Sequence, residues 1–484
     1  MLESVQVGAR RITVDVAVQI VARILNLALG VVVTLLLARG LGTSGFGVWS
    51  TLFAVTQIAN SFGELGLTQI TVSRVAAEPD REAQWLGALL QLRMLLVIPI
   101  TLGSLLAVLL IAPSPHDATA GVLISLVALV GAPAVLSVVF QLRIRNDISM
   151  AVITFNSILW AAAVIAVSAA AGGIVAYAVA FLASTAVTTG LNVALALRFT
   201  HVRLRDARRL WGPLLRVGVG VGIAGIFVTS YVKLDQILVF ELAGSHQAGL
   251  YGAAYRLLEQ VQFIPISVMT TLFPLIAAAH KADRRRMERM LQTAGEYLAM
   301  ASLPILAFTI VAAGPIMILL FGPSFAGAAK ALPILAGAFV SISFGYLVGN
   351  MVVVLELQLR FAVYAALGLL LNAALNLALI PSYGFLAAAW VTLLTELVVM
   401  SLSARVVLRR LHMRPHVGRL ARTLVAAAAM GLLTWAAHDA GVPLGGLAAI
   451  ALASYLPCLL MLRVVSIAEL RSVLRREPPV AGGA

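Results

Sequence analysis

Four charged residues lie inside one long apolar stretch, residues 231–260. Lys233 and Asp235 belong to its first apolar segment, and Arg256 and Glu259 belong to the second, after a short polar turn. A charge at the centre of a membrane helix costs about 2.5–3.5 kcal/mol on insertion scales, so such side chains need partners, water or a polar cavity. Basic side chains suit phosphate groups, and a buried carboxyl group suits proton or cation coupling. The pattern predicts a polar working interior between membrane helices.

The composition is that of a membrane protein. Mean hydropathy is +1.02, 61% of the residues are hydrophobic, and only 11% are charged, against about 25% in soluble domains. The one cysteine, Cys458, excludes a disulfide framework and a cysteine metal cluster. The histidines lack metal-ligand spacing, and no phosphate-binding GxxxxGK[ST] loop occurs. We therefore expect no metal site, no cofactor and no ATP hydrolysis by this chain.

Apolar runs predict an all-α polytopic membrane protein with about fourteen transmembrane helices. The connections between the runs are short, so no soluble domain is expected. The predicted spans lie near residues 16–38, 47–70, 86–112, 119–141, 149–171, 174–198, 216–240, 248–277, 294–321, 330–355, 361–380, 384–404, 421–440 and 444–463.

The distribution of basic residues tests this count, because a missed span would invert every later loop. With a cytoplasmic N-terminus, all but six of the 34 Lys and Arg residues fall in cytoplasmic segments, as the positive-inside rule requires. We therefore expect a cell-membrane protein with both termini in the cytoplasm. The net charge of +14 then reflects the membrane topology and the contact of cytoplasmic loops with anionic lipids. It does not indicate a nucleic-acid-binding site. The six exceptions are Arg39 and Lys330 in outside loops and Arg23, Arg93, Lys233 and Arg256 within spans.

Two pairs of similar segments indicate an internal repeat. Residues 45–49 (GFGVW) resemble residues 247–251 (QAGLY) at an offset of 202, and residues 173–178 resemble residues 384–389 at an offset of 211. All four stand where a span begins. Parallel six-span halves are typical of transporters that open alternately to the two sides of the membrane. We expect an N-terminal lobe at 1–205, a C-terminal lobe at 206–411, and two further spans with a cytoplasmic tail at 412–484.

Three stretches together resemble the polysaccharide flippases of the multidrug/oligosaccharidyl-lipid/polysaccharide exporter superfamily. The first is residues 41–50 (LGTSGFGVWS), after the first span. The second is the charged hairpin at 231–260. The third is residues 371–390 (LNAALNLALIPSYGFLAAAW), where Leu386-Ala387 replaces the usual glycine. The similarity extends over almost the whole chain.

This resemblance implies a V-shaped pair of six-helix lobes, followed by two additional helices, that moves lipid-linked sugars from the cytoplasmic to the outer leaflet. It also implies glycan polymerases or synthases as partners. In the distantly related lipid II flippases, spans 13 and 14 form an apolar groove for the lipid tail. Those proteins carry a denser cationic cluster in span 1, whereas Arg23 here is followed by Ile24.

The resemblance places spans 1, 7 and 8 along the cleft. We hypothesise that Arg23 and Arg256 bind the diphosphate of a lipid-linked glycan with help from Lys233, and that Arg93 is a more remote candidate. A fixed fork of donors and a permanent charge suit arginine to this role. Structural pairing remains the alternative, because Arg256 and Glu259 have i,i+3 spacing on one helix.

Four intramembrane acids are candidates for coupling to a proton or sodium gradient: Asp235 first, then Glu64, Glu259 and Glu396. Asp235 and Lys233 are two residues apart and face different sides of their helix. Asn372 and Asn376, one helical turn apart, are interpreted as interhelical hydrogen-bonding residues.

Three other functions stay open on sequence grounds. A cation-coupled small-molecule exporter of the same fold would have a more acidic cavity, and a lipid II flippase would have more cations in span 1. A membrane glycosyltransferase or polymerase would need carboxylates on its outer loops. Those loops are short and offer only Asp117, Glu241 and Asp439. The favoured interpretation is a non-enzymatic flippase.

Overall fold

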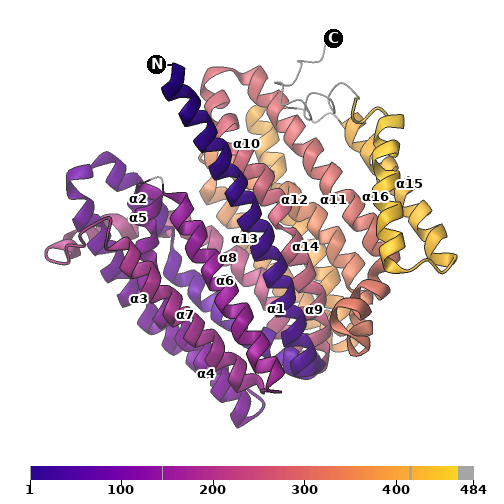
Figure 1. Cartoon of the computed structure of the whole chain (residues 1–484), viewed down its shortest axis with the longest axis horizontal. Coiled ribbons are helices and arrows are strands. Elements are labelled where there is room, and N and C mark those ends of the chain that lie inside the picture. The colour runs from indigo at the N-terminus through magenta and orange to yellow at the C-terminus, as the bar shows by residue number, and fades with distance from the viewer. Residues whose placement is uncertain (1, 144, 414–416, 467–484) are drawn as a thin grey trace. The chain divides into compact units, whose positions relative to one another are not determined.

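The computed structural model describes residues 2–143, 145–413 and 417–466. Every regular element in this part of the chain is a helix (Figure 1). The sequence predicts two further spans and a cytoplasmic tail at 412–484. Within this region, residues 414–416 and 467–484 lie outside the described part of the chain. The α-helices are α1 (Leu2–Glu64), α2 (Leu67–Ala77), α3 (Glu82–Ile111), α4 (Pro115–Gly131), α5 (Val138–Leu142), α6 (Asn146–Ala169), α7 (Ile174–Ala196), α8 (Trp211–Ala243), α9 (Ser245–Val261), α10 (Phe263–Ala282), α11 (Arg284–Phe321), α12 (Leu332–Val354), α13 (Gln358–Tyr383), α14 (Phe385–Leu411), α15 (Val417–Asp439) and α16 (Leu444–Met461). Four 3₁₀ helices join them: η1 (Pro79–Arg81), η2 (Ala132–Ser137), η3 (Ala207–Leu210) and η4 (Pro323–Lys330).

The helices are long and apolar enough to make this an all-α, multi-pass membrane protein. Thirteen stretches of the described chain meet both criteria. The first of them, Ala22–Ala77, contains Gly42, whose φ of 66° and ψ of 180° interrupt the helix. It therefore accounts for two expected spans, 16–38 and 47–70, which reconciles thirteen stretches with the predicted fourteen spans.

Three predicted spans are each divided between successive helices. The span at 47–70 is divided between α1 and α2, at Leu65 and Gly66. The span at 119–141 consists of α4, η2 and α5, with Pro133 in the first turn of η2. The span at 248–277 consists of α9 and α10, which meet at Gln262. Hydropathy does not detect these breaks, because the apolar character continues through them.

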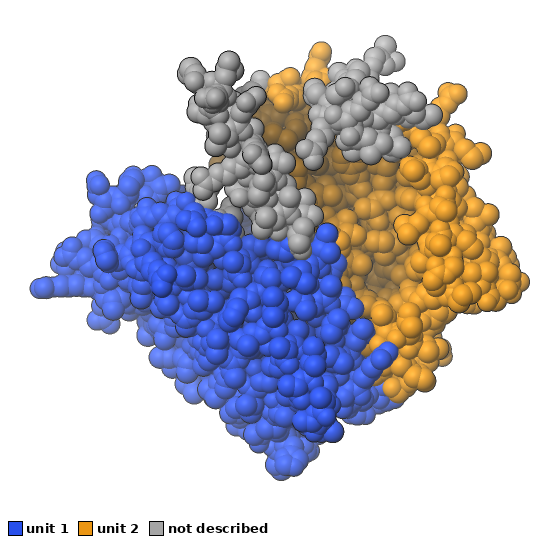
Figure 2. Space-filling view, viewed as in Figure 1, with its two compact units in different colours: residues 1–252, 358–388 blue, residues 253–357, 389–484 orange. Residues whose placement is uncertain are grey.

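The chain forms two compact units, which are described separately (Figure 2). Unit 1 comprises residues 1–252 and 358–388, and unit 2 comprises residues 253–357 and 389–484. These units divide the chain differently from the expected lobes at 1–205 and 206–411, and the lobes stay a prediction.

Within unit 1, α8 packs along α13, α4 along α7, and α1 along α6. The core beside α3 contains Trp85, Leu89 and Leu92, all nearly inaccessible. Farther along α3, Leu102, Leu106 and Leu110 are at least 61% exposed. An exposed stripe of leucines at helical spacing is what a lipid-facing helix presents.

Within unit 2, α11 packs against α12 and α15, and α15 packs against α16. Arginines of α15 complete this packing at one end. Arg419 Nε donates to the carbonyl of Val464 at 2.6 Å, and Arg422 Nη1 donates to that of Arg463 at 3.1 Å. These carbonyls follow the C-terminus of α16, where backbone acceptors lack helical partners.

The repeat at an offset of 202 has a structural counterpart within unit 1. Gly244, which is 202 residues after Gly42, has nearly the same backbone conformation, with φ 86° and ψ 166°. A Cβ added to Gly47 would lie 2.0 Å from the carbonyl oxygen of Ser245. A Cβ added to Gly249 would lie 1.9 Å from the carbonyl oxygen of Thr43. Gly249 is 202 residues after Gly47, and Ser245 is 202 residues after Thr43, so the two contacts are reciprocal.

The first prediction concerns this backbone contact. We expect Gly249→Ala to destabilise the protein by about 1–3 kcal/mol or more, because a main-chain oxygen stands where the methyl group would be. The midpoint of thermal unfolding of the purified protein measures the change. Gly225→Ala is the matched control, since a Cβ at Gly225 in α8 meets nothing within 4 Å. Equal thermal unfolding midpoints for the two variants would show that the backbone segments around Gly249 and Thr43 can move apart without loss of stability.

Candidate functional site

Asp235 is the centre of a buried polar cluster in unit 1. It lies on α8 with no exposed surface, and three neutral side chains donate hydrogen bonds to its carboxylate. The amide nitrogens of Asn372 and Asn376 on α13 bond to Oδ1 at 2.7 and 2.6 Å, and the Tyr251 hydroxyl on α9 bonds to Oδ2 at 3.1 Å. The cluster therefore places one acidic side chain among three neutral hydrogen-bond donors inside the membrane segments.

The two asparagines have the interhelical role expected of them. Their i,i+4 spacing puts both on the face of α13 that packs against α8, and the Asn376 amide also donates to Asn372 Oδ1 at 3.1 Å. Asn376 Oδ1 is buried and receives no hydrogen bond within the described part of the chain. A buried acceptor without a donor is costly. This oxygen is available to a cation or to an added proton.

A second set of hydrogen bonds positions the next residue of α8. Gln236 Nε2 donates to the Thr51 hydroxyl at 3.2 Å and to the carbonyl of Ala248 at 3.1 Å. Thr51 belongs to the second half of α1, and Ala248 to α9. Three helices are thus tied together one residue from Asp235.

The other charges of the 231–260 stretch have different environments. Lys233 is half-buried on α8, two residues from Asp235. In unit 2, Arg256 Nη1 and Glu259 Oε2 of α9 form an ion pair at 2.8 Å, with side chains 24% and 22% exposed. The pairing suggested by their i,i+3 spacing is confirmed, and their contact with a ligand stays a prediction.

Arg23 and Glu396 lie on other helices. Arg23 is half-buried on α1 in unit 1. Glu396 is 8% exposed on α14 in unit 2, near Tyr346, whose hydroxyl donates to Gln262 Oε1 at 3.2 Å. The roles expected of Arg23 and Glu396 stay predictions.

Glu64 and Arg93 share a separate cavity of about 260 Å³ in unit 1. Glu64 is the last residue of α1, and Arg93 lies a third of the way along α3. The two charges interact electrostatically but are not in direct contact. The remaining lining residues are Gly63, Leu67, Thr68, Gly131, Ala132, Ala134, Val135 and Ser137.

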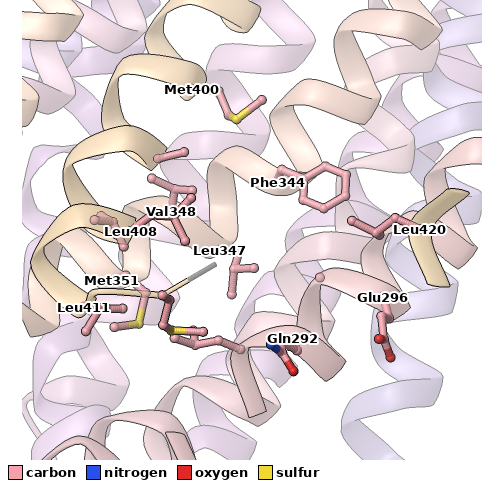
Figure 3. A pocket seen from close by; sticks show the side chains of 15 residues that line it. Gln292, Glu296, Phe344, Leu347, Val348, Met351, Met400, Leu408, Leu411 and Leu420 are labelled. Atoms are coloured by element: carbon pink, nitrogen blue, oxygen red, sulfur yellow. The ribbon is translucent and has the colours of Figure 1, made fainter. Parts of the chain in front are cut away.

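Unit 2 contains an apolar pocket of about 180 Å³ (Figure 3). Its walls come from α11, α12 and α14, with Leu420 contributed by α15. Gln292 and Glu296 are its polar lining side chains, and Glu296 Oε2 pairs with Arg419 at 2.9 Å. The apolar lining residues are Leu291, Gly295, Phe344, Leu347, Val348, Met351, Met400, Ala404, Val407, Leu408, Leu411, Met413 and Leu420.

Sequence reasoning missed the partners that only the tertiary structure brings together. Tyr251 was part of a repeat motif and was not connected to Asp235. Glu64 and Arg93 were separate candidates for coupling and for substrate binding. A feature of the sequence that accompanies this site is the glycine at position 63, next to Glu64. In the structure a Cβ at Gly63 would lie 2.4 Å from Arg93 Nη1, so the site requires a glycine there.

Comparisons with known proteins agree with the fold. The structure is similar to that of the lipid II flippase MurJ in an inward closed conformation, with a TM-score of 0.68, 13% identity, and coverage of 95% of this chain and 99% of that one. It is also similar to an inward-facing multidrug resistance MATE family transporter of the MOP superfamily, with a TM-score of 0.64, 15% identity, and coverage of 80% and 94%. At these identities the similarity concerns the fold.

Two sequence comparisons locate the family. The chain is 26% identical over 212 residues to the probable flippase AglR of Haloferax volcanii, and the match spans 42% of this chain and 44% of that relative. A family model described as polysaccharide biosynthesis protein matches residues 12–280, which include Asp235, Tyr251 and Arg256. Since this match covers more than half of the chain, the protein belongs to the polysaccharide biosynthesis protein family of multi-pass membrane proteins.

Proposed function

We propose that the protein moves a polyprenyl-diphosphate-linked oligosaccharide from the cytoplasmic to the outer leaflet, by alternating access, for the synthesis of a cell-surface polysaccharide. The observation that carries this proposal is the family match over residues 12–280, the part of the chain that contains Asp235 and Tyr251. The relative AglR is named a probable flippase, and MurJ a lipid II flippase. A transporter of this kind breaks no covalent bond in its substrate.

Cationic side chains of the membrane helices take the diphosphate in this proposal. Arg23, Lys233 and Arg256 are half-buried, so each combines a reduced dielectric environment with access to a ligand. Bidentate arginine contacts with phosphate are strong and directional. The glycan crosses with the headgroup, while the lipid tail remains in the bilayer.

Asp235 couples this movement to a proton or sodium gradient in our proposal. The cluster contains the Asp235 carboxyl group and, in Asn376 Oδ1, a buried acceptor that lacks a donor among the described residues. A sodium ion would satisfy both, and so would a proton on Asp235 after reorientation of the amide. Binding of either ion neutralises the only carboxylate in the cluster, which changes the charge between α8 and α13.

The apolar pocket of unit 2 suits part of the lipid tail. Its volume of about 180 Å³ holds a short stretch of one chain rather than a whole polyprenyl tail. The pocket is built mainly by α11, α12 and α14, whereas the resemblance led us to expect spans 13 and 14. Our proposal therefore assigns the tail to a different wall of helices.

The second prediction tests this assignment. Val348→Trp fills the pocket, so we expect it to slow flipping of a long-chain carrier several-fold while leaving a short-chain analogue unaffected. The measurement is the rate at which each of the two substrates, the long-chain carrier and the short-chain analogue, is flipped in proteoliposomes. Leu452→Trp on α16 is the control, since Leu452 is 79% exposed and does not line the pocket. A loss that is equal for the two chain lengths would contradict a role in tail binding.

The experiment that tests the function is the lipid-linked glycan profile of a deletion strain, with an impermeant sugar-cleaving enzyme added to spheroplasts. We expect a complete glycolipid that is shielded from the enzyme, together with loss of the surface polymer. An unchanged glycolipid pool with new drug sensitivity would instead indicate a small-molecule exporter. A truncated glycolipid would indicate an enzyme.

A further inference from the structure

The cavity shared by Glu64 and Arg93 is polar, although it lies among membrane helices. These two are the only charged residues among the described residues that line it. Thr68 on α2 and Ser137 on η2 add two hydroxyl groups. The volume of about 260 Å³ far exceeds the space that one water molecule needs, which is about 10–15 Å³ in the same measure. The cavity is therefore large enough for a small polar molecule.

The donors in the cavity are not satisfied by the protein. Among the residues that the structure describes, none accepts a hydrogen bond from the Arg93 guanidinium, and the hydroxyls of Thr68 and Ser137 make none. A guanidinium group has five N–H donors in a rigid fork. Gly63 makes room for it, because a Cβ there would lie 2.4 Å from Nη1 and 3.2 Å from Cζ.

The backbone beside the cavity adds further donors. Between α1 and α2, Leu65 and Gly66 have positive φ values of 36° and 66°, and no side chain caps the N-terminus of α2. Thr68 lies in that first turn, where free N–H groups and the helix dipole favour an anion. Helix α8 holds the break in place, since a Cβ at Gly222 would lie 2.4 Å from Leu65 Cα. The anion-binding side of the cavity is thus formed by Arg93 and the start of α2.

Charge balance selects the ligand. A simple anion bound to Arg93 would leave the cavity with a net negative charge, because Glu64 is also present. An excess charge within membrane segments is costly. A zwitterion, with its anionic group on Arg93 and its ammonium group near Glu64, leaves the cavity neutral. We propose that this cavity binds a phosphoethanolamine group, with the phosphate on Arg93 and the first turn of α2 and the ammonium on Glu64.

The group can come from a phosphatidylethanolamine lipid or from soluble glycerophosphoethanolamine, both of which are phosphodiesters whose single negative charge is balanced by the ammonium group. Calorimetric titration of the full-length protein in detergent distinguishes the two sources, with dihexanoyl-phosphatidylethanolamine, glycerophosphoethanolamine and dihexanoyl-phosphatidylglycerol as probes. We expect both ethanolamine compounds or the lipid alone to bind, and phosphatidylglycerol to bind about tenfold more weakly than the tighter of them. Binding of the lipid alone assigns the site to a membrane lipid, and equal binding of glycerophosphoethanolamine assigns it to a solute.

Three variants test the residues. Arg93→Gln and Glu64→Gln should each weaken binding of the ethanolamine probe about tenfold or more. The controls are Arg143→Gln and Glu82→Gln. These two residues form an ion pair at 2.8 Å, in which Glu82 is the first residue of α3, and neither lines the cavity. Both control variants should leave binding unchanged. Gly63→Ala keeps both charges and displaces the guanidinium, so it should weaken binding several-fold even if a charge variant fails to fold.

Two results would overturn the proposal. Phosphatidylglycerol binding as tightly as phosphatidylethanolamine, with no loss in Glu64→Gln, would define a simple anion site. Equal affinity of the wild-type protein and of Gly63→Ala for every probe would show that the probes bind outside this cavity. Both results are independent of whether the protein flips glycans, because the readout is binding.

Discussion

Asp235→Asn is expected to abolish gradient-driven transport while the protein remains folded in the membrane. The reason is the hydrogen-bond pattern around Asp235. An asparagine carbonyl oxygen can still accept from Asn372 and Asn376, and its amide can donate to the oxygen of the Tyr251 hydroxyl. The substitution therefore removes the charge and the protonation step and retains the geometry.

Asp235→Ala should behave differently. It removes the acceptor of three buried hydrogen bonds, although the Asn376 amide keeps its second bond, to Asn372, and each unsatisfied group costs about 1–3 kcal/mol, so we expect a large loss of folded protein. Uptake by proteoliposomes under an imposed proton or sodium gradient measures coupling, and the amount of monodisperse protein measures folding. Glu396→Gln serves as the comparison. Among the described residues, Glu396 is the other acidic side chain that is less than 9% exposed. If Glu396→Gln loses gradient dependence and Asp235→Asn keeps it, coupling resides in unit 2.

Arg256→Ala is expected to reduce transport about tenfold or more, because a hydrogen bond from a charged group to the diphosphate contributes about 1.5–3 kcal/mol. The structure offers a way to separate this role from pairing with Glu259. If Arg256 only neutralises Glu259, removal of both charges should restore transport. If Arg256 binds the substrate, Arg256→Ala/Glu259→Ala should be as inactive as Arg256→Ala. We expect the second result.

The matched control for this prediction is the pair formed by Arg81 and Glu78. It has the same i,i+3 spacing and the same distance of 2.8 Å, but its side chains are 47% and 36% exposed in a loop. Exposed pairs contribute little to stability. The double alanine variant of this pair should transport normally. Full activity of Arg256→Ala would remove this residue from the substrate-binding set.

Much of the fold was predictable because hydrophobicity in a membrane protein is a nearly complete signal. Backbone groups in the bilayer must be satisfied within the segment, which leaves long helices as the only solution for apolar runs of this length. Local spacing was informative for the same reason. The pair Asn372 and Asn376 and the pair Arg256 and Glu259 are each one helical turn apart, and each makes the contact that this geometry permits.

The composition of the sites was less predictable, because their partners come from distant helices. Tyr251 reaches Asp235 across 16 residues and a reversal of the chain, and Asn372 reaches it across 137. Arg93 meets Glu64 only because α1 ends at that residue and Gly63 admits the guanidinium. In an apolar sequence, the helix breaks at Leu65 and Gln262 do not change the periodicity of hydrophobic residues. Contacts between residues that are far apart in the sequence do not change it either.

The reciprocal contact of Gly47 and Gly249 carries information about the origin of the chain. If a half-length ancestor paired with a second copy of itself, the surface patch around its one glycine would meet the same patch on the other copy, as in an isologous dimer. In that dimer one glycine would satisfy both contacts, and a single mutation would damage both at once. In a chain formed by fusion the two positions would mutate independently, and here Gly47 faces the carbonyl of Ser245 and Gly249 faces that of Thr43. The glycine requirement thus persists at both positions, and the two halves can diverge everywhere except where their main chains touch.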